Sequence, residues 1–323
     1  MRKALFAVAA LVVAAKAPAL TSLAARLPYR VPETKRVRVI MDMDSANEAD
    51  DNFATLHALL TPQFEMKGLV SAHFAGNGPG TLQRSHAEMK RLLSIAEVTD
   101  VPVWTGAEGP LADAKTPREA EGVRAIIAEA LRDDPLPLFV ICGGPLTDVA
   151  SACLLEPTIA GRMTVLWTGG AAYPKGGWEY NLHNDPIAAN VVFASSLPLY
   201  QVTSRGYSCV RVGSAEAWLR LKDTGPGGRY LLKTLDDFNA REPRRGWPMG
   251  ETWIWGDSPL VMLAMSPDAP DNRYETVRAP QVDPRTFEYL PGSQTNRAIR
   301  VYEWFDGRAT LEDFFCKMAL ARP

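Results

Sequence analysis

A short apolar segment leads directly into a group of acidic residues in residues 37–51, which read VRVIMDMDSANEADD. Residues 37–41 form a nearly continuous apolar run of the kind that makes a strand buried on both faces, and this run ends at Asp42. Helical periodicity begins at 51–60 and stops before Pro62. The stretch therefore predicts a strand, an acidic turn and a helix.

The same alternation of strand-like and helix-like segments continues along the chain. Further strands are expected at 64–72, 101–105, 136–142, 163–167, 199–202 and 297–304, and further helices at 82–95, 119–131, 146–155, 187–194 and 311–318. The pattern indicates an α/β fold with a mostly parallel central sheet and helices on both faces. The region after Gly206 is less regular, with a helix around Trp218, and the proline-rich stretch 267–294 is expected to be an excursion from the fold.

Ligands of such folds bind at the carboxyl ends of the strands. Polar residues and glycine turns gather at the expected ends: Asp42 and Asp44, then Asn77, then Gly143. We therefore expect the functional site at this edge of the sheet.

The amino terminus has the character of a targeting segment. Arg2 and Lys3 precede an apolar run at 4–15, and small residues follow at 17–19. The run is too short for a stable membrane span, which needs roughly 20 residues. We predict a signal peptide at 1–19 and export to the bacterial periplasm or the extracellular space, with an uncleaved anchor as the alternative. A linker at 20–35 and one α/β domain at 36–323 complete the expected organisation.

Composition limits the partners. The chain has 35 basic and 37 acidic residues and a net charge of -2, so no basic excess exists to bind a nucleic acid polymer. A small molecule is the expected partner, and a homo-oligomer is left open. The four cysteines have no metal-finger or redox spacing, so we expect small buried apolar residues.

Four aspartates, Asp42, Asp44, Asp50 and Asp51, lie within ten residues. Carboxylates this close repel one another and raise one another's pKa unless a cation lies among them. A hard dication with oxygen ligands removes the repulsion, and calcium accepts six to eight such ligands. The alternative is that Asp50 and Asp51 favour a helix N-terminus through its dipole while Asp42 is a turn residue.

Several downstream polar residues are candidate partners of this cluster. Asn77 follows a strand, although Gly-Asn-Gly is also a common turn. Glu179 and Asn181 precede Asp185-Pro186, where the aspartate is expected to cap a helix. Asp257 also precedes an apolar helix, and its spacing favours a cap over a metal ligand.

The set of motifs resembles the inosine/uridine-preferring nucleoside hydrolases. That family begins with Asp-x-Asp, a spacer and Asp-Asp, and this chain has a spacer two residues longer. Gly144 to Asp148, the Glu179-Tyr180-Asn181 segment with its Asp-Pro, and Gly256 to Leu260 resemble three later motifs in the same order. The resemblance covers residues 37–318.

The resemblance implies calcium-dependent hydrolysis of the N-glycosidic bond of ribonucleosides, which releases ribose and base. It implies calcium ligands at Asp44, Asp51, Asp257 and the carbonyl of Gly143, with Asp44 also acting as general base on the water. It implies ribose-binding roles for Asp50, Asn77, Glu179 and Asn181, and a supporting role for Asp42.

The leaving-group side departs from the family. A histidine often precedes the late aspartate and can protonate the departing base, but Gly256 stands there in this chain. His183 and Trp255 are the remaining candidates near the base, and Trp178 and Trp253 flank the same region. We expect His57 and His73 to pack in the core and His86 to face solvent.

Three other functions remain open from the sequence. An aspartate-nucleophile phosphatase would use Asp42 with magnesium, but no downstream lysine with a paired acidic motif is convincing. An exported sugar- or nucleoside-binding protein would not need clustered aspartates. A family member that has lost activity, or that acts on another glycoside, is compatible with the change at Gly256.

Overall fold

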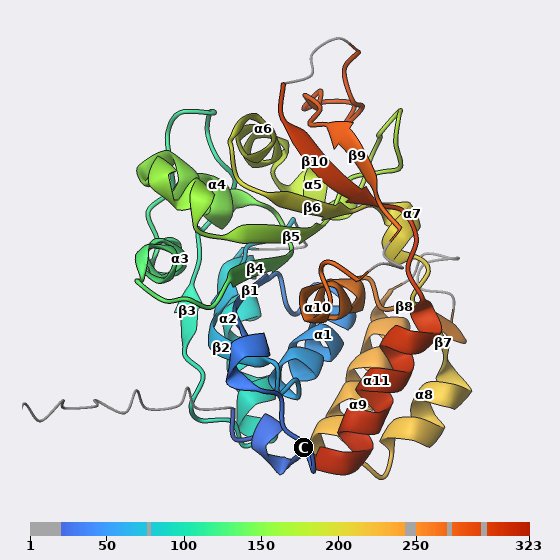
Figure 1. The fold of residues 1–323 in the computed structure, drawn as a ribbon. Helices are drawn as coiled ribbons and strands as arrows, with labels where there is room; N and C mark the ends of the chain where they lie inside the picture. Colours follow the sequence, from blue (N-terminus) through green and yellow to red (C-terminus); the bar gives the residue numbers. More distant parts are fainter. Residues whose placement is uncertain (1–20, 76–78, 243–249, 270–272, 292–295) are drawn as a thin grey trace, which may run out of the picture.

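The computed structural model of the chain describes residues 21–75, 79–242, 250–269, 273–291 and 296–323. An eight-stranded sheet runs through its centre in the order β3-β2-β1-β4-β5-β6-β10-β9 (Figure 1). All neighbouring strands are parallel except β10 and β9. The strands are β1 (Val37–Met43), β2 (Phe64–Ser71), β3 (Val103–Thr105), β4 (Leu138–Gly143), β5 (Thr164–Thr168), β6 (Leu199–Val202), β9 (Glu275–Arg278) and β10 (Ala298–Tyr302). The predicted α/β class and mostly parallel sheet are confirmed.

Helices cover both faces of the sheet (Figure 1). One face packs against α3 (Glu121–Leu131), α4 (Thr147–Leu155) and α6 (Pro186–Ala194), and the other against α1 (Asp50–Leu59), α2 (Thr81–Ile95) and α10 (Ser258–Met265). Helix α11 (Gly307–Ala321) packs on α10 and not directly on the sheet. Strand β1 contributes side chains to the apolar cores on both faces, because Val39 and Met41 belong to one apolar cluster and Ile40 to the other. All seven residues of β1 are buried, which explains its continuous apolar run.

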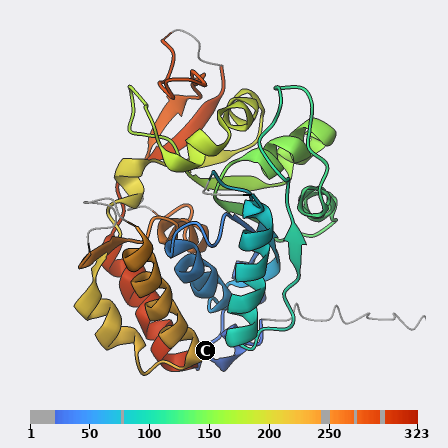
Figure 2. The ribbon, with the colours of Figure 1, turned by 180° about the vertical axis from the view of Figure 1, so that it is seen from behind.

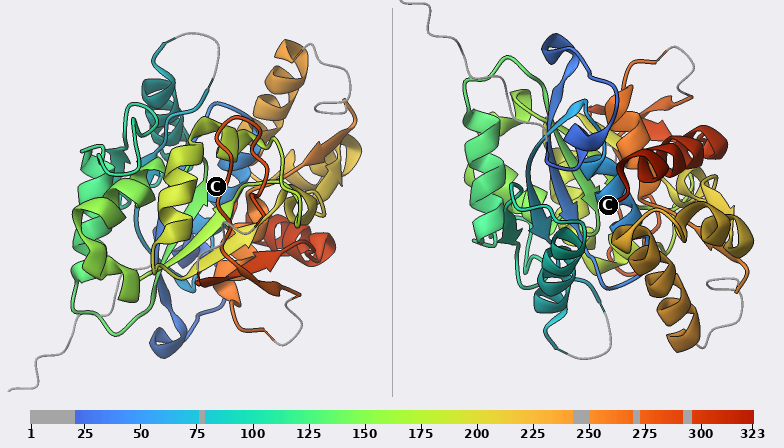
Figure 3. Two further views of the ribbon diagram at one scale, coloured as in Figure 1. Left: turned by 90° about the horizontal axis from the view of Figure 1, so that it is seen from above. Right: turned by 90° about the horizontal axis from the view of Figure 1, so that it is seen from below.

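A second group of helices lies beside the sheet. Helices α8 (Ser214–Leu221) and α9 (Pro226–Arg241) pack with α11, and the antiparallel pair β7 (Arg211–Gly213) and β8 (Thr252–Ile254) lies next to them. The view from behind shows these helices beside α1 and α2 (Figure 2), and the views from above and below show them on the side opposite to α3 and α4 (Figure 3). Two short helices, α5 (Tyr180–Asn184) and α7 (Ser204–Tyr207), follow the ends of β5 and β6.

Most predicted elements are present with ends moved by a few residues. The exceptions are in the less regular second half, where the expected excursion at 267–294 contains β9, the antiparallel edge strand. β9 is mostly exposed and carries no apolar run, so hydrophobic periodicity gives no signal for it. Its hydrogen bonds to β10, rather than its side chains, define it as a strand.

The segment expected to be a linker packs against the fold from residue 21 onward. Leu23 and Leu27 are buried in the apolar core, and the Thr21 hydroxyl donates to the carbonyl oxygen of Leu59 at 2.6 Å. Residues 21–27 are therefore anchored to the fold, whereas residues 28–35 are mostly exposed, and the linker stays a prediction for that second part. The predicted signal peptide at 1–19 lies outside the described residues.

The described residues also bear on the question of a membrane span and on the cysteines. No helix within them has the length and apolar character needed to cross a bilayer. All four cysteines are free thiols. Only Cys142 is buried, whereas Cys153 and Cys209 are half-buried and Cys316 is exposed, so the expectation of four buried cysteines was wrong for three.

Candidate active site

The carboxyl ends of β1, β4 and β5 meet at one edge of the sheet, where a cavity of about 420 Å³ opens. Parallel pairing of β1 with β4 sets Met43 beside Gly143, so Asp44 leaves its strand next to the end of β4. Acidic side chains dominate the lining: Asp44, Glu48, Asp50, Asp51, Glu179 and Asp257. The aspartate cluster thus lies where the α/β pattern predicts a ligand site.

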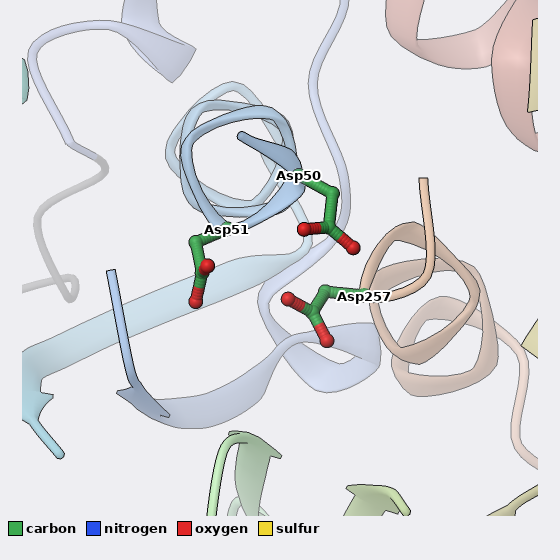
Figure 4. A group of neighbouring side chains, drawn as sticks. All are labelled: Asp50, Asp51 and Asp257. Atoms are coloured by element: carbon green, nitrogen blue, oxygen red, sulfur yellow. The ribbon is translucent and has the colours of Figure 1, made fainter. Parts of the chain in front are cut away.

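Three carboxylates from the starts of two helices converge in this cavity (Figure 4). Asp50 and Asp51 begin α1, and Asp257 immediately precedes α10. One oxygen of each lies within 4.8 Å of the others, so the three can share one metal ion. Asp51 is buried, and its Oδ1 has no hydrogen-bond partner among the described residues. An orphaned buried carboxylate oxygen needs a positive partner.

Burial raises the pKa values of all three carboxyl groups, and repulsion from neighbouring carboxylates adds to the effect for Asp51 and Asp257. Burial, followed by the charges of Asp44 and Asp257, raises the pKa of Asp51 well above its ordinary value. Burial, followed by Asp50 and Asp44, does the same for Asp257, and burial raises the pKa of Asp50 to about 6. A dication among these oxygens would relieve the repulsion, and a donor set made only of oxygens suits a hard ion such as calcium or magnesium.

The predicted helix cap at Asp257 is absent, because its side chain makes no cap hydrogen bond to α10. The side chain instead lies against Gly143, where a Cβ atom would come within 2.7 Å of Asp257 Cγ and Oδ1. The Gly143 carbonyl accepts a hydrogen bond from Asp44 N at 3.3 Å. Close approach of the β4 backbone therefore turns Asp257 toward the acidic cluster, and only glycine permits that approach.

Asp44 is buried beside the trio and is held by an amide that the sequence analysis did not single out. Asn184 donates from Nδ2 to Asp44 Oδ2 at 3.4 Å and accepts from Ala75 N at 2.9 Å. Burial, then the charges of Asp50 and Glu179, raises the pKa of Asp44 well above its ordinary value. Asn184 lies between two predicted residues in the chain, so its position in that segment was the available signal.

Asp42 lies beneath the cavity rather than in its lining. It is 0% exposed, and neither carboxylate oxygen has a hydrogen-bond partner among the described residues. Asp148, which the sequence placed only at the end of a family-like motif, is also buried and accepts from Ala107 N at 2.8 Å. Burial, followed by the charges of Asp148 and Asp44, raises the pKa of Asp42.

Glu179 and Asn181 enter the cavity at the start of α5. Glu179 caps this helix, with Oε2 accepting from Gly170 N at 2.8 Å and from Leu182 N at 2.9 Å. Asn181 donates from Nδ2 to the carbonyl oxygen of Thr168 at 2.8 Å. Both lie in the cavity as the sequence predicted. The predicted cap at Asp185 is confirmed by its 2.8 Å bond from Ala188 N.

The remaining leaving-group and ribose-binding candidates are not found in the described cavity lining. Asn77 falls outside the described residues. Trp255 is 1% exposed and stacks on Phe53 with a 4.0 Å centroid separation, so it belongs to the core and cannot face a leaving group. The packing of Phe314 and Phe315 around the Trp255 ring explains this correction.

His183 is exposed and does not line the cavity, although its ring lies 6.0 Å from that of Trp178. Trp178, by contrast, is 59% exposed and lines the cavity mouth. The other histidines follow expectation in part: His57 and His73 are buried as predicted, whereas His86 is half-buried rather than solvated.

Tyr207 is a cavity residue without a sequence signal. Its hydroxyl donates to Glu179 Oε1 at 3.3 Å, and its ring lies against Gly256. A Cβ atom at Gly256 would lie 3.1 Å from Asp50 Oδ2 and 3.4 Å from Tyr207 Cδ2. The space beside Gly256 is therefore narrowed by an aspartate and a tyrosine.

The chain belongs to the inosine-uridine preferring nucleoside hydrolase family, whose sequence pattern matches residues 39–301. It is 28% identical over 187 residues to the pyrimidine-specific ribonucleoside hydrolase RihA of Escherichia coli O127:H6 (strain E2348/69 / EPEC) and to the protein of the same name from Salmonella arizonae (strain ATCC BAA-731 / CDC346-86 / RSK2980). Each match covers 50% of this chain and 58% of the relative, so the chain spans less than two thirds of these relatives' length.

Solved structures show the same fold. A plant nucleoside hydrolase, the PpNRh1 enzyme, and an inosine-guanosine nucleoside hydrolase each superpose with a TM-score of 0.70. Both are 18% identical to this chain, and each match covers 88% of this chain and 99% of the other. The likeness extends over nearly the whole of these folds.

Proposed function

We propose that this protein hydrolyses the N-glycosidic bond of ribonucleosides with a bound calcium ion and releases ribose and free base. One observation carries the proposal: the oxygens of Asp50, Asp51 and Asp257 converge in the same cavity as Glu179 and Asn181. Membership of the nucleoside hydrolase family supports the reaction class.

Calcium would be held by Asp44, Asp51, Asp257 and the Gly143 carbonyl, and the convergence of Asp50 with Asp51 and Asp257 makes it a further candidate ligand. The unpartnered Oδ1 of Asp51 supports a cation there. When bound, the ion would orient the sugar hydroxyls and acidify the attacking water. The oxygen-only donor set favours calcium over softer transition metals.

Asp44 is the proposed general base. Its carboxylate would accept the proton of the attacking water as the C1′–N bond breaks. The hydrogen bond from Asn184 limits its rotation, so one carboxylate oxygen keeps its direction. The surrounding carboxylates would stabilise the positive charge that develops on the sugar in an oxocarbenium-like transition state.

Glu179, Asn181 and Asp50, with Asn77, are the proposed partners of the ribose hydroxyls. Two main-chain N–H groups hold Glu179 Oε2, which leaves Oε1 and the Tyr207 hydroxyl on the cavity side. A site that hydrogen-bonds a hydroxyl rejects a substrate lacking it by a factor on the order of 10⁴. We therefore expect poor turnover of 2′-deoxyribonucleosides.

The burial of Asp42 argues against a phosphatase. A nucleophile must reach the substrate, and Asp42 is 0% exposed and absent from the cavity lining. A binding protein without catalysis is the remaining rival. Export from the cell, cleavage of a signal peptide at 1–19 and a homo-oligomeric state are separate proposals, tested by amino-terminal sequencing of the cellular protein and by light scattering.

A reducing-sugar assay over a ribonucleoside panel, with calcium and with a chelator, tests the reaction. We expect ribose release from the wild type that stops on chelation and is lost in Asp44→Asn. Asp223→Asn is the matched control, because Asp223 is exposed and far from the cavity lining. Absence of ribose release from every nucleoside in the presence of calcium would leave only the binding protein.

A further inference from the structure

The cavity has a strongly one-sided charge. Six acidic side chains line it, and no lysine, arginine or histidine is among the lining residues that the structure describes. A cleft of one sign with low-dielectric walls concentrates ions of the opposite sign. The charge of this cavity therefore favours a substrate that carries a positive charge.

Aromatic rings line the same cavity. Trp178 at the mouth is 59% exposed, and Tyr180 and Tyr207 lie further in. Glu48 lines the cavity together with both tyrosines, and burial followed by nearby carboxylates, Glu48 among them, raises the pKa of each hydroxyl. Aromatic faces beside carboxylates are the combination that binds flat or quaternary organic cations through cation–π attraction.

The cavity also lacks an imidazole to protonate a departing base. Gly256 replaces the histidine of the family motif, and Asp50 and Tyr207 narrow the space beside it. His183 does not line the cavity. A neutral base leaves with the bonding electron pair and therefore needs a proton, whereas a base that is already cationic leaves as a neutral molecule.

We propose that this cavity selects ribosides whose base carries a positive charge, such as pyridinium ribosides and N7-alkylated purine ribosides. The inference rests on the proposed hydrolysis. The C1′–N bond breaks, and both electrons pass to the ring nitrogen, which becomes neutral. The water oxygen bonds to C1′, and the proton of that water passes to Asp44. No second acid takes part.

Comparison of 1,7-dimethylinosine with 1-methylinosine tests this selectivity, since methylation at N1 prevents loss of the ring proton and the two ribosides then differ by one fixed positive charge. Methylation at N7 also makes the glycosidic bond more labile, so the readout is the change in the ratio of their kcat/KM values between variants. Glu48→Gln and Trp178→Leu should each lower this ratio by about fivefold to tenfold, the size of a partly desolvated cation–π or charge contact. Glu119→Gln, an exposed carboxylate paired with Arg124, is the control of equal charge change and should leave the ratio unchanged.

A binding measurement separates this inference from the reaction. 1-Methylnicotinamide, a cation, should bind the calcium-loaded protein about tenfold more tightly than neutral nicotinamide, and Glu48→Gln should reduce the difference. If 1-methylinosine is hydrolysed but neither variant changes the ratio, cation selectivity is refuted while the hydrolase proposal stands. If no riboside is cleaved but the cation still binds preferentially, the hydrolase proposal fails and cation recognition stands. Equal binding of the two probes would overturn the inference.

Discussion

Substitution of Gly143 by alanine tests the geometry that brings the late aspartate into the metal site. The new Cβ would lie 2.5 Å from Met43 Cε and 2.7 Å from Asp257 Cγ and Oδ1. The methionine methyl group can rotate away, but the carboxylate must move out of the cluster. We expect overpacking to lower the free energy of unfolding by about 1–3 kcal/mol. We also expect calcium affinity to fall 10- to 100-fold, as when groups that orient a metal ligand are changed.

The linkage between binding and folding gives the magnitude. At calcium 100 times the wild-type dissociation constant, binding stabilises the wild type by about 2.7 kcal/mol. A 100-fold weaker site would give about 0.4 kcal/mol at the same concentration, and a tenfold weaker site about 1.4 kcal/mol. Urea unfolding with and without calcium measures this difference, and Gly161→Ala is the control because no atom lies within 4 Å of its added Cβ. Equal calcium stabilisation in Gly143→Ala and wild type would show that Asp257 does not need the glycine at position 143 to reach the metal site.

Stability should also depend on Asp313 and His57, on the buried Trp255 and on the bound metal. Burial raises the pKa of Asp313, but His57 and then Lys317 outweigh that effect and bring the pKa to about 2. The stabilising contribution of Asp313 is therefore complete above pH about 3.8 and is lost as the pH falls toward 2. Asp313→Ala should therefore cost at most about 2 kcal/mol at neutral pH, since the side chain is 32% exposed, and should flatten the acid limb of stability against pH. Burial lowers the pKa of His57 against the opposing hydrogen bond to Asp313, so unfolding should also be favoured as the pH falls below about 6.5. Trp255→Phe should lower the denaturation midpoint without a matching loss of kcat, and a loss of kcat alone would contradict its place in the core. Chelation should lower the thermal midpoint of the wild type, and an unchanged midpoint would count against a folded-state metal.

Local patterns predicted much of the fold. Continuous apolar runs such as 136–142 predict strands, because a strand of a parallel sheet is buried on both faces and therefore needs apolar residues at consecutive positions. β9 lacks such a run, since it is an exposed edge strand defined by its hydrogen bonds to β10. The packing of residues 21–27 was not predicted for a similar reason, because two leucines in an irregular segment carry no periodicity.

Only some residues of the cavity could be predicted from the sequence. Asp44, Asp50 and Asp51 follow a strand and begin a helix, so their proximity is local and was predicted from the chain. Glu179 and Asn181 were predicted through the family resemblance and lie in the cavity. Tyr207 was not predicted, because nothing in its own segment points to Glu179, 28 residues away.

The sequence by itself determined the acidic turn, since the apolar run before it must be a buried strand and the residues after it must start a helix. Only the tertiary structure decided the roles of the two residues around Gly256. The sequence spacing favoured a helix cap at Asp257, and Trp255 was a candidate for a ring that faces the base. The structure turns Asp257 toward Asp50 and Asp51 and buries Trp255 against Phe53. The deciding contacts join parts of the chain about 200 residues apart, as in the 2.8 Å bond from Gly256 N to Asp50 Oδ2, at a separation of 206 residues. Local preference cannot encode such contacts, because they exist only when the two helix starts meet in the folded chain.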